Sequence, residues 1–259
     1  MKNTSTKITP NRSNNNEIFT ILFACFIQHS FHVGSENAYK PFAYLDEKGA
    51  PTGFDNEAVK IVAAYIPQAK VKFSSLTWNA IFSGLDSGKF DVVANQIAKT
   101  KEREEKYLFS KEPYFYGVSA LILGKDEKIK DFSSLNGQKI GATVGSNHAK
   151  NLENYKANHP EATFEIVYYK TSPALVADLA NGRLSAIIND PISTLDFAKA
   201  QNVQVYPTDV VLEKTPIYFV FRKDSAHLLQ VFDQALEQAL KDGKISELSV
   251  RYFGKDFSR

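Results

Sequence analysis

The stretch Val92-Val93-Ala94-Asn95-Gln96-Ile97-Ala98-Lys99-Thr100-Lys101-Glu102-Arg103 guides the interpretation of the whole chain. Its first three residues are apolar, which is the pattern of a fully buried strand. The amides Asn95 and Gln96 follow at once, and the stretch ends with a hydroxyl and a guanidinium group. In open α/β sheets, ligands bind beyond the carboxyl ends of the strands. The stretch therefore predicts a buried strand that carries polar groups to a binding site.

The composition limits the possible functions. The chain has 259 residues, of which 43% are hydrophobic and 23% charged, as is usual for a globular protein. This length allows one large domain or two small ones. The net charge is only +2, and no basic stripe carries interleaved aromatic residues, so no nucleic-acid partner is predicted. A single cysteine excludes an internal disulfide.

Residues 1–27 are predicted to be a leader or a tether. A polar and basic segment, 1–16, precedes a short apolar run over 18–24 and then Cys25. This order is typical of an export signal. The residues before Cys25 also resemble a lipobox, in which the cysteine would be lipidated. The alternative is a mis-assigned start or an N-terminal tail. No stretch reaches the roughly 20 apolar residues that a membrane span needs.

Strands and helices alternate along the remaining sequence. Apolar runs predict strands over 30–34, 71–73, 92–94, 118–123, 138–143, 164–169, 186–188, 203–206 and 218–221. Amphipathic spacing predicts helices over 56–66, 78–86, 172–179, 228–242 and 244–252, and another that opens at 145–147. Asp55 or Asn56 is the expected N-cap of the first helix. Such alternation favours an α/β fold with parallel sheets flanked by helices.

An internal similarity indicates two units of related build. Residues 88–95 and 182–189 share a glycine, a basic residue, an apolar residue, a polar residue, three apolar residues and an asparagine. The alternative is chance, because many α/β proteins share such residue patterns where a helix leads into a strand. Two similar lobes with sites at facing strand ends would form a cleft, the geometry of a binding protein that closes about a hinge.

Several polar residues are candidates for holding a charged ligand. Arg103 could bind a carboxylate through its planar fork, helped by Thr100 and by the backbone near Ala98. The alternative for Arg103 is a surface ion pair with a neighbouring glutamate.

Two further positions lie at junctions between a strand and a helix. Ser146 and Asn147 lie where free N–H groups would attract an anion, although a plain N-cap is the alternative. Asp190 follows a buried strand and could bind an ammonium group, or simply form a turn.

Aromatic residues would complete such a site. Tyr39 and Trp78 could be walls beside the ligand, and core packing is the alternative. One carboxylate-binding group, one ammonium-binding group and two aromatic walls together fit an α-amino acid zwitterion. The sequence has no cluster of histidines, cysteines and carboxylates at metal spacing, no nucleophile elbow and no phosphate-binding loop. No catalytic residue, metal or cofactor is predicted.

From residue 31 onward, the sequence resembles the solute-binding proteins of bacterial ABC importers for polar amino acids. The resemblance rests on Tyr39-x-Pro41-Phe42, Gly53-Phe54-Asp55, Trp78-Asn79, Leu85-x-Ser87-Gly88-Lys89-Phe90-Asp91, Thr100-x-x-Arg103, Phe109-Ser110-x-x-x-Tyr114, Gly137-x-x-Ile140-Gly141, Gly145-Ser146, Gly182-Arg183 and Phe221-Arg222-Lys223. It implies the two-lobed periplasmic-binding-protein (Venus-flytrap) fold with two crossover strands as a hinge. The lobes would comprise residues 28–116 plus 218–259, and 117–217.

The resemblance also implies roles for the candidate residues. Arg103 would bind the α-carboxylate with backbone near Ala98 and with Ser146 and Asn147, and Asp190 would bind the α-ammonium. Tyr39 and Trp78 would flank the ligand side chain, with Glu36 at the pocket edge. His148 either selects the side chain or lies exposed. The pair Asn95 and Gln96 is most similar to the cystine-binding branch.

The expected protein is therefore a periplasmic or surface-located monomer. It would capture an α-amino acid, best L-cystine, and deliver it to a membrane permease of an ABC importer. Another polar amino acid is the first alternative. A second is an enzyme on the same fold, similar to cyclohexadienyl dehydratases, for which Glu36 would be the general acid. A third is a sensor domain.

Overall fold

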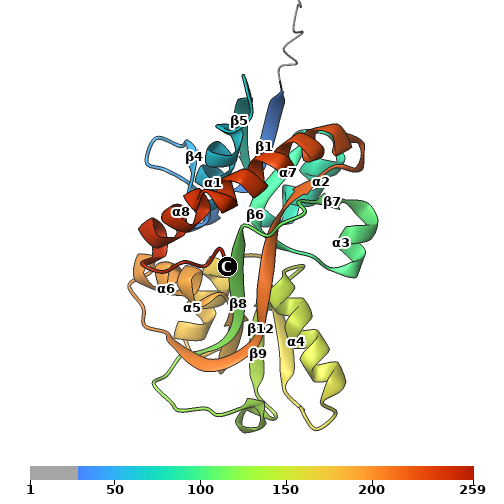
Figure 1. Cartoon of the computed structure of the whole chain (residues 1–259). Helices are drawn as coiled ribbons and strands as arrows, with labels where there is room; N and C mark the ends of the chain where they lie inside the picture. The colour runs from blue at the N-terminus through green and yellow to red at the C-terminus, as the bar shows by residue number, and fades with distance from the viewer. Residues whose placement is uncertain (1–28) are drawn as a thin grey trace, which may run out of the picture.

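Two long antiparallel strands, β8 (Phe115–Leu123) and β12 (Tyr206–Phe221), run through the centre of the molecule in the computed structural model, which describes residues 29–259 (Figure 1). They pair from Tyr206 opposite Leu123 to Ile217 opposite Phe115. The predicted leader and Cys25 lie outside the described residues. The strands link two groups of parallel strands into one hydrogen-bonded sheet, ordered β10-β9-β11-β8-β12-β6-β1-β5.

The first lobe is built on parallel strands β1 (Ser30–Glu36), β5 (Lys70–Leu76) and β6 (Val92–Ala98). Strand β12 closes its edge antiparallel to β6 and also pairs with the short β7 (Leu108–Phe109). Its helices are α1 (Phe54–Ala63), α2 (Ile81–Asp86), α3 (Lys101–Lys106), α7 (Ala226–Lys241) and α8 (Lys244–Phe253). A small sheet of β2 (Ala38–Tyr39), β3 (Ala43–Leu45) and β4 (Pro51–Thr52) follows β1.

The second lobe repeats this plan with parallel strands β9 (Lys139–Thr143), β10 (Glu165–Tyr169) and β11 (Ala186–Asn189). Strand β11 pairs antiparallel with β8, just as β6 pairs with β12. The helices are α4 (Asn147–Asn158), α5 (Ser172–Ala180) and α6 (Pro191–Ala200). The two-lobed α/β fold predicted from the sequence is confirmed.

The amphipathic pattern of α7 shows how sequence positions an element. Its buried residues are Leu228, Phe232, Ala235, Leu236 and Ala239. These positions share one face of a helix with 3.6 residues per turn. Helix α7 packs that face beside α1 and α8 against the first lobe (Figure 1).

An aromatic cluster joins the start of β8 to the first lobe. The ring of Phe115 lies 5.2 Å from that of Phe54 and 5.3 Å from that of Phe42, centroid to centroid. It also contacts Phe253 and Phe257 near the C-terminus at 5.5 and 5.4 Å. Because aromatic rings bury large apolar areas, this cluster anchors the crossover strand to the helices that cover it.

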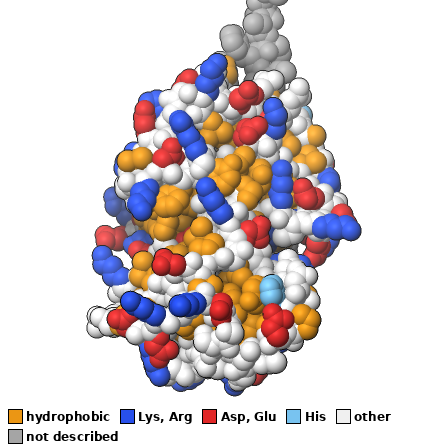
Figure 2. Space-filling model, turned by 60° about the horizontal axis from the view of Figure 1, so that its bottom comes forward, with side chains coloured by type: hydrophobic (Ala, Val, Ile, Leu, Met, Phe, Trp, Pro, Cys, Tyr) orange, Lys and Arg blue, Asp and Glu red, His pale blue; other side chains and the backbone are white. Residues whose placement is uncertain are grey.

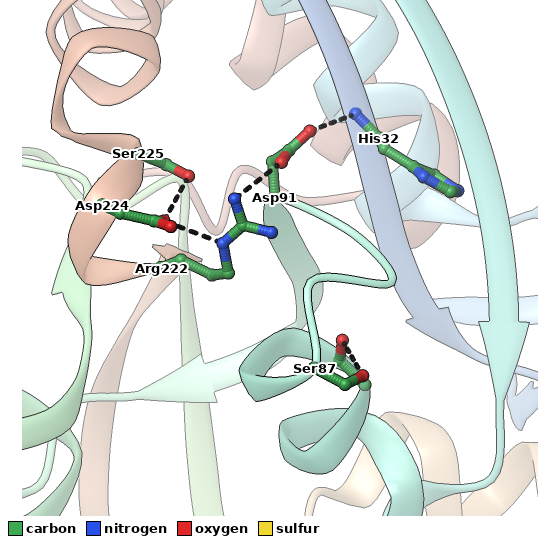
Figure 3. Close-up of polar contacts among 7 residues, drawn as sticks. His32, Ser87, Asp91, Arg222, Asp224 and Ser225 are labelled. Atoms are coloured by element: carbon green, nitrogen blue, oxygen red, sulfur yellow. Dashed lines mark hydrogen bonds and ion pairs between the residues drawn. The ribbon is translucent and has the colours of Figure 1, made fainter.

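A polar cluster lies at the edge of the first lobe where β1 and β6 begin and β12 ends (Figure 3). The Asp91 carboxylate accepts a hydrogen bond from the His32 backbone N–H at 3.2 Å and pairs with Arg222 at 3.4 Å. The Arg222 guanidinium also binds Asp224 at 2.8 Å. Gly88 leaves room for this guanidinium, because a Cβ there would lie 2.8 Å from Nη1. Two of the sequence motifs thus meet in the scaffold.

Charges of both signs are dispersed over the surface shown in Figure 2. Lysine and arginine side chains alternate there with aspartate and glutamate, and hydrophobic side chains gather between them. This face therefore has no extended region of a single charge.

Several element boundaries differ from the sequence predictions. The predicted strand 203–206 is wrong except for Tyr206, where β12 begins, and the predicted strand 218–221 is only the end of this long strand. The prediction that Asp55 or Asn56 caps the first helix is wrong: Gly53 is the N-cap, and both residues are buried within the first turn. The charged segment 101–106 forms helix α3, capped by Thr100.

We expect Phe115→Ala to destabilise the protein by about 3–5 kcal/mol, because it leaves a cavity among four aromatic rings. Urea unfolding followed by circular dichroism measures the change. The control is Val211→Ala on the paired strand, where the side chain is 49% exposed and little should change. Equal stability of the two variants would contradict the proposed role of the aromatic cluster.

Candidate functional site

A cavity lies between the two lobes, where the carboxyl ends of their strands face each other. Its lining residues are Glu36, Tyr39, Trp78, Asn95, Gln96, Thr143, Ser146, Asn147, His148, Ser172 and Asn189. Seven of the ten ligand-binding residues predicted from the sequence are in this set. The other three, Ala98, Arg103 and Asp190, lie directly beside it in sequence or in space. Arg103 lines an adjoining cleft that shares Ser146 with the cavity.

The sequence similarity between residues 88–95 and 182–189 has a structural counterpart. Gly88 and Gly182 both adopt a left-handed conformation, with φ of +71°. Each is followed by a buried strand whose asparagine, Asn95 or Asn189, lines the cavity. The two lobes therefore present equivalent strand positions to the same space.

Arg103 is a buried cation without a carboxylate partner among the described residues. Its side chain donates to the Ala98 carbonyl at 3.0 Å and to the Gly145 carbonyl of the other lobe at 2.9 Å. The alternative of a surface ion pair is wrong, since Glu102 pairs with Lys106 instead. Burial lowers the pKa of Arg103 to about 10, so the group remains charged at neutral pH. An anionic ligand would supply the missing countercharge.

The N-terminus of α4 faces the same region. Ser146 caps the helix, because its hydroxyl accepts a hydrogen bond from Ala149 N–H at 3.1 Å. It also donates to the Thr143 carbonyl at 2.7 Å. Ser146 is thus an N-cap, and it also lines the cavity. The free N–H groups of a helix N-terminus favour an anion beside Arg103.

Asp190 is buried at the start of α6, only 4% exposed. Its Oδ1 caps the helix by accepting from the backbone N–H groups of Ile192 at 2.9 Å and Ser193 at 3.1 Å. Burial raises the pKa of Asp190 to about 6, partly offset by these hydrogen bonds. The carboxylate is therefore mostly ionised at neutral pH, and its Oδ2 lies on the side of β8 at Gly117.

Glu36 and Asn95 form a linked pair on the first lobe. The Asn95 side chain accepts from the Glu36 backbone N–H at 2.6 Å and donates to its carboxylate at 3.4 Å. Burial raises the pKa of Glu36 to about 7, opposed by the Asn95 hydrogen bond. The cavity therefore has a carboxylate that titrates near neutral pH.

Two aromatic residues of the first lobe contact the second lobe. The Trp78 indole donates to the Val144 carbonyl at 3.0 Å, and the Tyr39 hydroxyl accepts from Ser193 at 3.2 Å. Tyr39 is also packed against Phe42 and Phe197. It therefore both lines the cavity and packs in the core. With the Arg103 contact to Gly145, these bonds hold the lobes together across the cavity.

The structure adds cavity residues that the sequence did not single out as ligand-binding. Thr143 at the end of β9 and Ser172 at the start of α5 line the cavity, with their hydroxyls 3.1 Å apart. Asn189 is 1% exposed and its amide nitrogen has no partner among the described residues. Its match with Asn95 in the repeated pattern was the signal that could have identified it.

His148 is buried rather than exposed, which excludes that alternative. Its Nδ1 lies 2.8 Å from the Ser119 hydroxyl. Burial lowers the pKa of His148 to about 4, so the ring is neutral at physiological pH. The second lobe thus lines the cavity with neutral polar groups, whereas the first contributes Glu36.

The chain belongs to the bacterial extracellular solute-binding proteins, family 3, whose model matches residues 31–255. It is 35% identical over 230 residues to "Probable amino-acid-binding protein YxeM" of Bacillus subtilis, covering 88% of this chain and 85% of that one. It is 30% identical over 230 residues to L-cystine-binding protein TcyK of the same organism, covering 88% and 84%. An ancestral arginine-binding protein bound to arginine has a TM-score of 0.75 at 29% identity, with coverage of 87% and 98%.

We expect Trp78→Phe to weaken binding of an amino acid about 3- to 10-fold, because one hydrogen bond between the lobes is lost. Isothermal calorimetry measures the change. Tyr168→Phe is the matched control, since it removes an exposed hydrogen bond to Glu153 within the second lobe. Unaltered affinity in Trp78→Phe would show that this contact does not hold the closed arrangement.

Proposed function

We propose that this chain captures an α-amino acid between its lobes and delivers it to the membrane permease of an ABC importer. L-cystine is the proposed ligand. The observation that carries the proposal is Arg103, a buried guanidinium that faces the interlobe cleft without a carboxylate partner among residues 29–259. Membership of the solute-binding family supports the transport role.

The carboxylate end of the ligand would bind at the rim shared by the two lobes. Arg103 offers a planar donor fork, and the N-terminus of α4 at Ser146 and Asn147 adds backbone N–H groups. Ala98 has no side-chain hydroxyl and contributes only backbone, which already orients Arg103 through its carbonyl. Thr100 helps indirectly by capping the helix that carries Arg103.

The ammonium end would bind at Asp190. The backbone N–H groups of Ile192 and Ser193 fix its Oδ1, and the backbone of Val118 on β8 also contacts this carboxylate. A buried ammonium group would lower the pKa of Asp190 again by supplying an opposite charge. Arg103 belongs to the first lobe, whereas Ser146, Asn147 and Asp190 belong to the second, so binding the whole zwitterion favours closure.

The ligand side chain would extend toward Glu36, between Tyr39 and Trp78. Glu36 could bind a second ammonium group, as found at the far end of L-cystine, and the similarity to TcyK supports that choice. Neutral donors on the opposite wall, Asn189 among them, would suit the second carboxylate. Another polar amino acid is the alternative, because the relatives also include a probable amino-acid-binding protein and a probable histidine-binding protein.

The hinge and location follow from the same proposal. We place the lobes at residues 28–116 plus 218–259 and at 117–217, so that β8 and β12 bend when the cleft opens. The chain would act as a monomer in the periplasm or at the cell surface, with lipid attachment at Cys25. Among the described residues, no helix has the length and apolarity required to cross a membrane. Capture rather than turnover is the proposed activity.

A ligand panel tests the proposal. We expect calorimetry to show micromolar or tighter binding of L-cystine or a close relative, about −8 kcal/mol or better. Arg103→Ala should weaken every amino-acid ligand by about 2–5 kcal/mol, because its carboxylate would lose a buried charged partner. Arg103→Lys keeps the charge but lacks the fork, and should fall between. Unchanged affinity in Arg103→Ala would sink the assignment.

The pH dependence tests the role of Glu36. Its pKa near 7 in the unliganded protein means that a bound second ammonium must compete with a proton. We expect affinity for L-cystine to fall relative to L-glutamine as the pH is lowered from 8 to 6. In Glu36→Gln this relative fall should disappear. A ratio of the two affinities that does not change with pH would contradict the assigned contact.

A further inference from the structure

We infer that Asp55 is a positioning residue for ligand recognition: it orients the Gln96 side chain so that the amide oxygen faces the space beside Asp190. The Gln96 amide oxygen and an Asp190 carboxylate oxygen would then together accept hydrogen bonds from an ammonium group. This inference rests on the proposed function and extends it to a residue that does not line the cavity.

Asp55 holds Gln96 at two points. Its Oδ2 accepts from the Gln96 backbone N–H at 2.9 Å, and its Oδ1 accepts from the side-chain Nε2 at 2.8 Å. Asp55 lies in the first turn of α1, is 0% exposed and forms no ion pair with any described residue. An ionised carboxylate has no hydrogen to donate and only accepts hydrogen bonds. It therefore binds the NH2 group of the Gln96 side chain rather than the amide oxygen.

Gln96 needs such support. Its φ of +50° is unusual for a residue with a side chain, and it occurs within β6 where the register to β12 shifts between the pairs Ile97–Tyr218 and Val93–Val220. Positive φ costs free energy and persists only when the surroundings impose it. The two hydrogen bonds from Gln96 to Asp55 provide that constraint and turn its side chain along the cavity wall.

The freed amide oxygen points to a specific place. A Cβ added to Gly117 on β8 would lie 3.7 Å from Gln96 Oε1 and 3.9 Å from Asp190 Oδ2. The two acceptor oxygens therefore border the same small space, which stays open because residue 117 is glycine. One belongs to a carboxylate and the other to an amide, a combination suited to a cation that donates several hydrogen bonds.

Asp55 is mostly ionised at pH 8. Burial raises its pKa to about 7, while hydrogen bonds with Gln96 and Tyr114 oppose the rise. The other titratable groups nearby are Tyr114, Tyr39 and Glu36, and none of them is a cation. Because the pKa of Asp55 is raised on folding, the folded protein loses stability as the pH rises from about 4 to 7, where the unfolded chain releases this proton first.

The variant Asp55→Asn separates positioning from structural support. The amide group introduced at position 55 can donate to Gln96 Oε1, which turns the Gln96 NH2 group toward Asp190. We expect affinity for L-cystine, L-arginine, L-glutamine and L-histidine, each that binds the unaltered protein, to fall at least tenfold at pH 8. Thermal stability without ligand should stay equal or rise, because a buried charge has been removed.

A double-mutant cycle tests whether Asp55 acts through Gln96. Glycine adopts positive φ without strain and has no side chain to orient. Asp55→Asn should therefore cost little further affinity in the Gln96→Gly background. The pH arm is a matching readout: the affinity ratio of the unaltered protein to Asp55→Asn should shrink as the pH falls from 8 to 6.

The outcomes are distinct. Loss of affinity with retained stability, and coupling in the cycle, support the inference. Equal affinity in Asp55→Asn, an equal loss in both backgrounds, or a parallel loss of affinity and stability would overturn it while leaving the proposed function intact. Absence of amino-acid binding by the unaltered protein would overturn the proposed function and the inference together.

Discussion

The antiparallel pairing of β8 with β12 is the constraint on which the arrangement of the site depends. β12 pairs with β8 along the second lobe and then with β6 in the first. Backbone hydrogen bonds therefore fix where the carboxyl ends of β6 and β11 stand relative to each other. Because Asn95 of β6 and Asn189 of β11 both line the cavity, the sheet topology places matching polar groups on both walls.

The site combines charged groups whose burial is compensated in different ways. Arg103 and the Asp190 carboxylate are both held by uncharged backbone groups rather than by countercharges. Burying a charge this way is costly unless an opposite charge completes the site. A zwitterion would supply one countercharge to each group at once. This electrostatic demand is the physical reason why the arrangement favours an amino acid over a neutral solute.

The sequence predicted the fold from local patterns, and seven of the residues it singled out line the cavity. Alternating strands and helices indicated the α/β lobes, and the spacing Thr100-x-x-Arg103 corresponds to one capped helical turn. The contacts of Asp55 could not be predicted, since its partner lies 41 residues away and its position suggested only a helix cap. The continuity of β12 was also missed, because its polar middle resembles a loop when its pairing partner is unknown.

The contacts across the cavity also have a mechanical meaning. Trp78, Arg103 and Tyr39 each bind a polar group of the opposite lobe, and apart from these contacts the polypeptide crosses between the lobes in a few extended segments. A captured solute would act as a removable cross-link between two lobes that are also joined by the paired strands and by packing of Tyr39 against Phe197. Heat or denaturant would then have to break both lobes at once in the loaded protein, whereas in the empty protein each lobe could yield at its own threshold.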